Sequence, residues 1–133
     1  MGRIGSLRGV WASGESDIYV VGDFGAILHN DGSGWQSVAS GVDATLYDVW
    51  GSAADNVYAV GQAGTILRYN GTEWSAMASG TTVTLTGIWG NAADDVYAVG
   101  EDGTMLLYQG AQWDKLETGF AENLNDAWGD RKN

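Results

Sequence analysis

The sequence predicts an all-β protein made of repeated four-stranded antiparallel units. The first observation is a segment of 39 residues that occurs three times. The tryptophans follow this spacing in two series, Trp11, Trp50, Trp89 and Trp128 in one and Trp35, Trp74 and Trp113 in the other. The second observation is that no window places its apolar residues three and four apart over about ten residues, as an amphipathic helix requires.

The repeat is a close one. When residues 46–84 are aligned with residues 85–123, 18 of the 39 positions are identical. This level of identity indicates duplication of one structural unit, and a fixed period of this length is typical of repeat architectures. A further copy of the start of the unit, "LNDAW", follows at residues 124–128.

Each unit contains four runs of strand length. In the second unit they are "LYDVW", "NVYAV", "GTILRY" and "EWSAM", which are rich in β-branched and aromatic residues. The intervening "VGQAGT" and "YNGTEW" supply the glycine and asparagine that hairpin turns favour, because these residues tolerate positive φ. We therefore expect sheets over about 7–45, 46–84 and 85–123, all within one domain of 133 residues, and an extra strand at 124–128.

Four antiparallel strands in about 40 residues are typical of one blade of a β-propeller. A single blade cannot bury both of its faces, so blades must stack on one another. We expect Trp50 and Trp89 to be extensively buried between blades. We expect the same contacts to contain Val57, Val60, Ile66, Leu67, Tyr69 and Trp74. A β-solenoid is disfavoured, because its turns are shorter and contain fewer hairpins.

The stretch "VWGSAADNVYAVGQAGTILRYNGTEW" resembles bacterial β-propeller repeats related to the BNR (Asp-box) type, which occur in sialidase-like and photosystem-assembly-factor-like propellers. The resemblance covers residues 7–129. The strict box, S-x-D-x-G-x-x-W, is not kept, since the hairpins read "NDGSGW", "YNGTEW" and "YQGAQW" and the box aspartate is present only as Asp31. The resemblance implies the propeller fold, and it implies a turn-stabilising role for the box.

Three blades do not close a ring, because propellers typically have four to eight. An open arc would expose the apolar flanks of its end blades, and such patches mark interfaces. We therefore expect a homodimer that forms a six-bladed ring, since two-fold dimers are the commonest closed assembly. In this dimer, "LNDAW" could replace "LRGVW" in the partner's first blade. Alternatively, the chain is a fragment of a longer propeller.

The composition disfavours several partners. The formal charge is −11, with 17 acidic and 6 basic residues, so phosphate backbones and anionic membranes would be repelled. There is no cysteine, no apolar run long enough to span a membrane, and no apolar segment of a signal peptide at the start. We expect a soluble protein that binds neither nucleic acid nor membrane. It is either cytoplasmic or exported, with the signal absent from this chain.

The sequence offers few candidates for catalysis. His29 aligns with Arg68 and Leu107 in the other copies, so a surface position is favoured over a catalytic base. No Ser-His-Asp set or H-x-x-x-H spacing is present. Asp55 and Asp94 precede the second strand of their units, where a turn-stabilising role is favoured over calcium binding. We expect no catalytic residue, no cofactor and no metal site.

Differences between the copies concentrate in two sets of loops. These follow the second strand and the fourth strand, and because successive strands run in opposite directions the two sets should share one face. A constant scaffold with one variable face is typical of a binding module. The candidate ligand-binding residues on this face are Asp23, Phe24, Tyr47, Asp48, Gln62, Glu101, Asp102, Asn125 and Asp126.

The favoured function is a non-catalytic binding or interaction propeller that recognises a protein or a glycan on the variable face. One alternative is a carbohydrate-active hydrolase or lyase, in which carboxylates such as Asp48, Glu101 and Asp126 would act in pairs. Another is a fragment of a larger propeller with a purely structural role.

Overall fold

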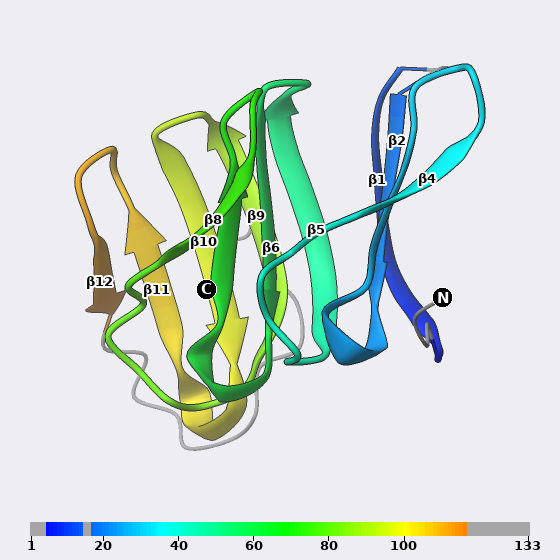
Figure 1. Ribbon diagram of the computed structural model, residues 1–133. Coiled ribbons are helices and arrows are strands. Elements are labelled where there is room, and N and C mark those ends of the chain that lie inside the picture. The colour runs from blue at the N-terminus through cyan, green and yellow to red at the C-terminus, as the bar shows by residue number, and fades with distance from the viewer. Residues whose placement is uncertain (1–4, 15–16, 117–133) are drawn as a thin grey trace.

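The computed structural model describes residues 5–14 and 17–116 (Figure 1). These residues form three four-stranded antiparallel sheets, each made from one copy of the repeat and each with its strands in sequence order. The sheets stand side by side as blades, which confirms the predicted fold class. The end of the third unit and the predicted strand at 124–128 lie outside the described residues.

The first blade contains β1 (Leu7–Gly14), β2 (Asp17–Gly22), β3 (Ile27–Asn30) and β4 (Trp35–Val38). The second contains β5 (Leu46–Ala53), β6 (Asn56–Gly61), β7 (Ile66–Tyr69) and β8 (Trp74–Met77). The third contains β9 (Leu85–Ala92), β10 (Asp95–Gly100), β11 (Met105–Tyr108) and β12 (Trp113–Leu116). Single 3₁₀ turns join the second strand to the third, η1 (Asp23–Gly25), η2 (Gln62–Gly64) and η3 (Glu101–Gly103).

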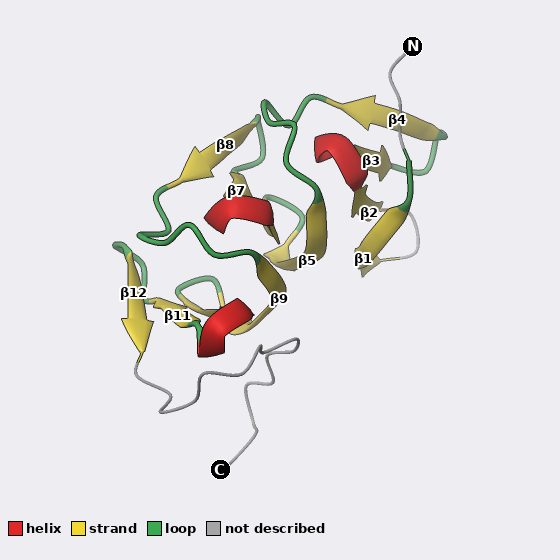
Figure 2. Ribbon diagram, turned by 90° about the horizontal axis from the view of Figure 1, so that it is seen from below, coloured by secondary structure: helices red, strands yellow, loops and turns green. Residues whose placement is uncertain are grey.

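The first strands β1, β5 and β9 lie next to one another along the inner edge of an arc, and the fourth strands lie on the outside (Figure 2). Each first strand is irregular near its start. In the second blade, Leu46 pairs with Gly61 but Asp48 pairs with Val60, so Tyr47 is an extra residue opposite the second strand. Such a bulge bends a strand and redirects its side chains, and the same shift recurs in the other two blades.

The core lies between the blades. In each of the two junctions, a tyrosine, a valine and an isoleucine from one blade pack against the first, second, third and fourth strands of the next. We call the first surface the trailing face of a blade and the second surface the leading face. The trailing residues are Tyr19, Val21 and Ile27 in the first blade and Tyr58, Val60 and Ile66 in the second.

The leading face of the second blade contains Leu46, Val49, Val57, Ala59, Leu67 and Trp74. All of these residues are buried, and Tyr69 packs beside them as a partly buried residue. The six apolar residues predicted to fill the contacts between blades therefore do so. Burial of this kind is the main favourable contribution to folding, and here it depends on the stacking of neighbouring repeats.

The prediction for Trp50 and Trp89 was wrong, because both side chains are only partly buried. Trp50 lies at the rim of the second junction, over the first strand of the third blade. A Cβ atom added at Gly90 would lie 2.6 Å from Cη2 of Trp50, and one added at Gly51 would lie 2.7 Å from Cη2 of Trp11. Each glycine therefore accommodates the tryptophan of the preceding blade.

The buried tryptophans belong to the other series. Trp74 forms a T-shaped contact with Tyr19, at 5.8 Å between ring centroids, and Trp113 forms one with Tyr58 at 6.1 Å. Aromatic pairs favour such geometry because the positive edge of one ring meets the negative face of the other. The same aromatic pair thus links each blade to the next.

Candidate functional site

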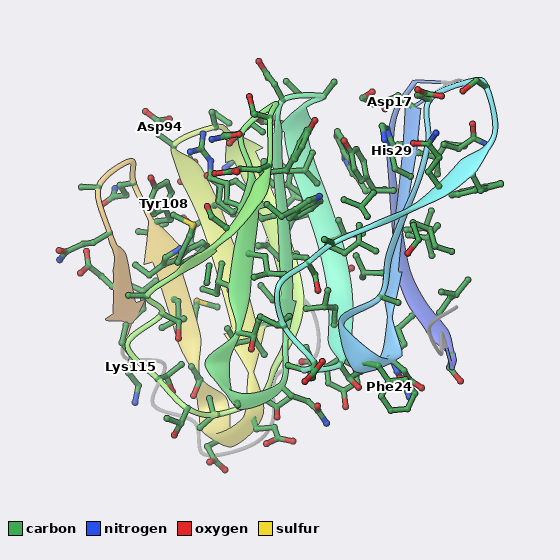
Figure 3. The ribbon with its side chains drawn as sticks, viewed as in Figure 1. Asp17, Phe24, His29, Asp94, Tyr108 and Lys115 are labelled. Atoms are coloured by element: carbon green, nitrogen blue, oxygen red, sulfur yellow. The ribbon has the colours of Figure 1, made fainter. Side chains whose placement is uncertain are left out.

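The structure brings the two variable sets of loops together at one edge of the arc. A Cβ atom added at Gly25 would overlap the carbonyl oxygen of Val42, and one added at Gly64 would overlap that of Thr81. Phe24 marks this edge in Figure 3, whereas Asp17 and Asp94 lie at the opposite edge. We call the edge with Phe24 the ligand face.

The turns of the ligand face have the same backbone in every blade. In η1, the amide of Gly22 donates to the carbonyl of Ala26 at 3.0 Å and the amide of Asp23 donates to Ser6 at 2.9 Å, and η2 and η3 repeat both bonds. The middle residues Phe24, Ala63 and Asp102, which we call the apex residues, have φ values of 62, 59 and 59°.

Left-handed backbone is uncommon for residues with a side chain and costs on the order of 1–3 kcal/mol. The surrounding hydrogen bonds hold it in all three turns. Each apex side chain is exposed at the tip, so each blade presents one side chain from a fixed backbone: an aromatic ring, a methyl group and a carboxylate. The turns therefore differ in chemistry and not in shape.

The first residue of each turn has a structural contact. Oδ2 of Asp23 accepts a hydrogen bond from the Ser6 amide at 3.0 Å, and Oε1 of Gln62 accepts one from the Thr45 amide at 3.0 Å. Both oxygens fix the chain where it enters the first strand. Glu101 occupies the same position in η3, and its side chain is exposed.

A charged group joins the first and second blades at the ligand face. Nε of Arg8 donates to Oδ1 of Asp23 at 2.6 Å, and the Arg8 guanidinium lies 5.2 Å from the centre of the Tyr47 ring. The Ser6 amide and then the Arg8 guanidinium lower the pKa of Asp23. The hydrogen bond to Asp23 raises the pKa of Arg8. Sequence reasoning missed Arg8, which lies at the extra position of the strand bulge.

Asp48 links the second blade to the third. Its Oδ2 accepts a hydrogen bond from the Ile88 amide at 2.9 Å, and its Oδ1 accepts one from the Val49 amide at 3.0 Å. The carboxylate is half-buried and links the first strand of the second blade, β5, to that of the third blade, β9. A role in ligand binding or in acid–base chemistry would compete with these bonds.

The candidate residues therefore form a row along the ligand face. Asp23, Phe24 and Tyr47 gather at the first junction, Gln62 lies on the second blade, and Glu101 and Asp102 lie on the third. Asn125 and Asp126 lie outside the described residues. An open hollow of about 520 Å³ lies on this face, lined by Gly64, Met77 and residues 79–82.

The opposite edge carries a row of polar side chains across each blade. In the first blade, Oγ of Ser13 donates to Asp17 at 2.6 Å, and Nε2 of His29 lies 2.5 Å from the same carboxylate. The His29 ring stacks on Tyr19 at 4.1 Å, so the expected surface histidine is half-buried in a network. The corresponding bonds are Asn56 to Ser52, Arg68 to Asn56, and Asn91 to Asp95.

Two opposing effects set the pKa of Asp17. Burial raises it, whereas the hydrogen bonds with His29 and Ser13 lower it, and the net effect is that the pKa of Asp17 is lowered. The period of 39 in positions 13, 52 and 91 and in positions 17, 56 and 95 was a signal for these rows. Within the described ranges, no group of three or more histidine, aspartate or glutamate side chains is arranged to hold a metal ion.

The box aspartate acts in its turn as the resemblance implied. Oδ1 of Asp31 accepts hydrogen bonds from the Ser33 amide at 3.0 Å and the Ser33 hydroxyl at 2.6 Å. In the second blade, Oδ1 of Asn70 accepts from the amides of Thr72 and Glu73 at 2.9 and 3.1 Å. An asparagine can therefore replace the aspartate, because the turn requires only a side-chain acceptor.

Three stacked four-stranded blades with turns gathered at one edge define a β-propeller protein. Among solved structures, the chain is similar to YCF48 from Cyanidioschyzon merolae, with a TM-score of 0.66 and 18% sequence identity. The similarity covers 86% of this chain and 41% of that chain, so this chain spans less than half of the length of its neighbour. No family model matches the sequence, and the comparison with curated proteins finds no match.

Within the part of the chain that the structure describes, no helix is long and apolar enough to cross a membrane.

Proposed function

We propose that this chain is a non-catalytic recognition module and that a protein or a glycan binds its ligand face. One observation carries the proposal. Three turns share one strained backbone and one set of hydrogen bonds, yet their apex residues are Phe24, Ala63 and Asp102. Rigid scaffolds that present different side chains at matching positions are well suited to recognition.

The two ends of the ligand face favour different ligand groups. At the first blade, Phe24 is 45% exposed and stands on the blade that holds Arg8 over Tyr47. Exposed aromatic rings bind the apolar face of a sugar or another aromatic group. At the third blade, the exposed carboxylates of Glu101 and Asp102 favour hydroxyl or cationic groups. A ligand that spans the arc would meet both chemistries.

The second blade supplies the control for an experiment, because Ala63 shows that alanine fits the apex geometry at φ 59°. We expect Phe24→Ala and Asp102→Ala to keep the fold and to abolish binding. The probe is an immobilised glycan array, beside a bead-bound peptide library, and both are tested with the full chain. Asp55→Ala, on the opposite edge, is the matched control and should bind like the wild type.

The proposal is supported if the wild type and Asp55→Ala both bind an immobilised glycan or peptide and Phe24→Ala does not. A panel of chromogenic glycosides tests the alternative function. Turnover that Asp48→Asn removes would overturn the proposal in favour of a carbohydrate-active enzyme. Equal loss of binding in the Phe24 and Asp55 variants would also overturn it, because the ligand face would then have no separate role.

A further inference from the structure

The first blade exposes three large apolar side chains whose equivalents in the other blades are buried. Leu7 is 50% exposed, whereas Leu46 and Leu85 are 0% exposed. Val10 is 64% exposed, whereas Val49 and Ile88 are 4% exposed. Trp35 is 52% exposed, whereas Trp74 and Trp113 are 8% and 7% exposed. The leading face of the first blade is thus uncovered.

The third blade contains the surface that covers such a face elsewhere. In the first junction, the leading residues pack against Tyr19, Val21 and Ile27. Tyr97, Val99 and Met105 occupy these positions in the third blade. Val99 is buried, as Val21 is, but Tyr97 and Met105 are only half-buried, whereas Tyr19 and Ile27 are buried. One chain therefore holds both halves of a junction, at opposite ends of its arc (Figure 1).

We propose that a second copy of this chain covers the first blade, and that its third blade packs head to tail on Leu7, Val10 and Trp35. Trp35 then meets Tyr97 of the second copy, as Trp74 meets Tyr19 and Trp113 meets Tyr58 inside the chain. Two copies form two such seams, which gives six blades. This inference is independent of the ligand proposed above.

A second copy is favoured because the required surface is specific. A leading face accommodates a tyrosine, a valine and an aliphatic side chain in the register of a neighbouring second and third strand. The chain presents this set once more, at its other end. Contacts that are head to tail form either closed rings or open filaments, and a curved arc of three blades favours closure.

The seam differs from the internal junctions at one position. Ala12 stands where Gly51 and Gly90 accommodate the tryptophan of the preceding blade. A Cβ atom at those glycines would lie within 2.7 Å of the indole, so Trp89 of the second copy must shift when it meets Ala12. The seam is therefore looser than the junctions inside the chain, and dissociation occurs there.

The test is sedimentation equilibrium of the full chain over concentrations from nanomolar to tens of micromolar. We expect a dimer whose Kd rises at least tenfold in Trp35→Ala and falls severalfold in Ala12→Gly. Phe24→Ala is the matched control, because it removes an exposed aromatic ring from the ligand face and should leave the Kd unchanged. Circular dichroism shows whether each variant is folded.

Charged variants test the direction of packing. Leu7→Arg and Tyr97→Asp should each be monomeric alone, and their mixture should associate because one seam then contains two unaltered faces. A dimer of Tyr97→Asp alone would overturn the head-to-tail arrangement. The inference would be overturned if the wild type were a monomer at tens of micromolar. It would also be overturned if Ala12→Gly raised the Kd of the dimer.

Discussion

Truncation of the leucine that opens each blade tests the packing of the junctions. The same repeat position is fully buried at Leu46 and half exposed at Leu7, and both residues begin the first strand of their blade. Leu46→Ala and Leu7→Ala therefore remove the same atoms from a closed junction and from an open flank. Any difference between them measures what the preceding blade contributes.

The expected magnitudes follow from burial. Truncation of a buried leucine to alanine costs roughly 2.7–5 kcal/mol, because a cavity adds to the lost transfer free energy. We expect about 3 kcal/mol for Leu46→Ala. Leu7 has lost only half of its contact with water and lines no enclosed cavity, so about 1 kcal/mol is expected from transfer alone. The difference of about 2 kcal/mol is large beside a domain stability of about 5–15 kcal/mol.

The assay is urea unfolding followed by tryptophan fluorescence, at a protein concentration low enough for the chain to be monomeric. The midpoint should fall without a change in the slope, and Leu85→Ala should match Leu46→Ala. Equal losses for Leu7→Ala and Leu46→Ala in dilute solution would refute the reasoning. At higher concentration, the cost of Leu7→Ala should approach that of Leu46→Ala, because binding of a second copy stabilises the folded chain by mass action.

Three further predictions concern single contacts. Gly90→Ala should destabilise the chain by roughly 1–3 kcal/mol because its methyl group meets Trp50. Trp50→Phe in the same chain should lessen this loss, and additive losses in a double-mutant cycle would contradict the contact. Asp48→Ala should cost about 1–3 kcal/mol because the amide of the buried Ile88 loses its acceptor, and unchanged unfolding by urea would count against that bond. The lowered pKa of Asp17 means that its contribution to stability is complete above the ordinary value of about 3.9 and is lost as the pH falls through the folded-state value. The stability difference between the wild type and Asp17→Asn should therefore shrink below about pH 4, and a constant difference from pH 7 to pH 3 would exclude this linkage.

The blades could be predicted because their signals are local. Strands, turns and the period of 39 depend on residues within one copy of the repeat. Asn70 and Gly71 illustrate this: the pair predicts a tight turn, and the structure has Gly71 at φ +99° with the Asn70 side chain accepting hydrogen bonds from the turn. Such features need no knowledge of the neighbouring blade.

The roles of the tryptophans could not be predicted in the same way. A glycine directly follows Trp50, Trp89 and Trp128, and this pattern suggests that each glycine makes room for the tryptophan beside it in the sequence. In the structure, Gly51 instead makes room for the indole of Trp11, and Gly90 makes room for that of Trp50. A strict repeat hides this exchange, because a contact within a blade and a contact between blades have the same sequence period.

The candidate site shows the opposite difficulty, in which different residues perform one task. Asp23 and Gln62 differ between copies, so they look like variable ligand-binding positions. Both provide a side-chain oxygen for the amide that precedes the first strand. Comparison of residue types cannot reveal this shared acceptor. At the apex position, by contrast, the chemistry itself changes between copies, from the ring of Phe24 to the methyl group of Ala63 and the carboxylate of Asp102.

The fourth copy of the first strand raises the last prediction, because its exchange into a second copy's first blade would replace β1. The exchange would put Asp126 at the position of Gly9. A Cβ atom at Gly9 would lie 2.9 Å from Cα of Asp48, and this neighbour is backbone that a rotamer change cannot move. Gly9→Asp reproduces the exchange within one chain and should cost roughly 1–3 kcal/mol or more from overpacking. Gly9→Ala adds only a methyl group and therefore measures the steric part of the loss in stability. The additional loss in Gly9→Asp then measures the repulsion between its carboxylate and that of Asp48. If Gly9→Asp unfolds at the same urea concentration as the wild type, the steric objection fails. If it is destabilised as expected, β1 is the strand that fits beside Asp48 of the second blade, and each seam joins an intact first blade to the third blade of the other copy without strand exchange.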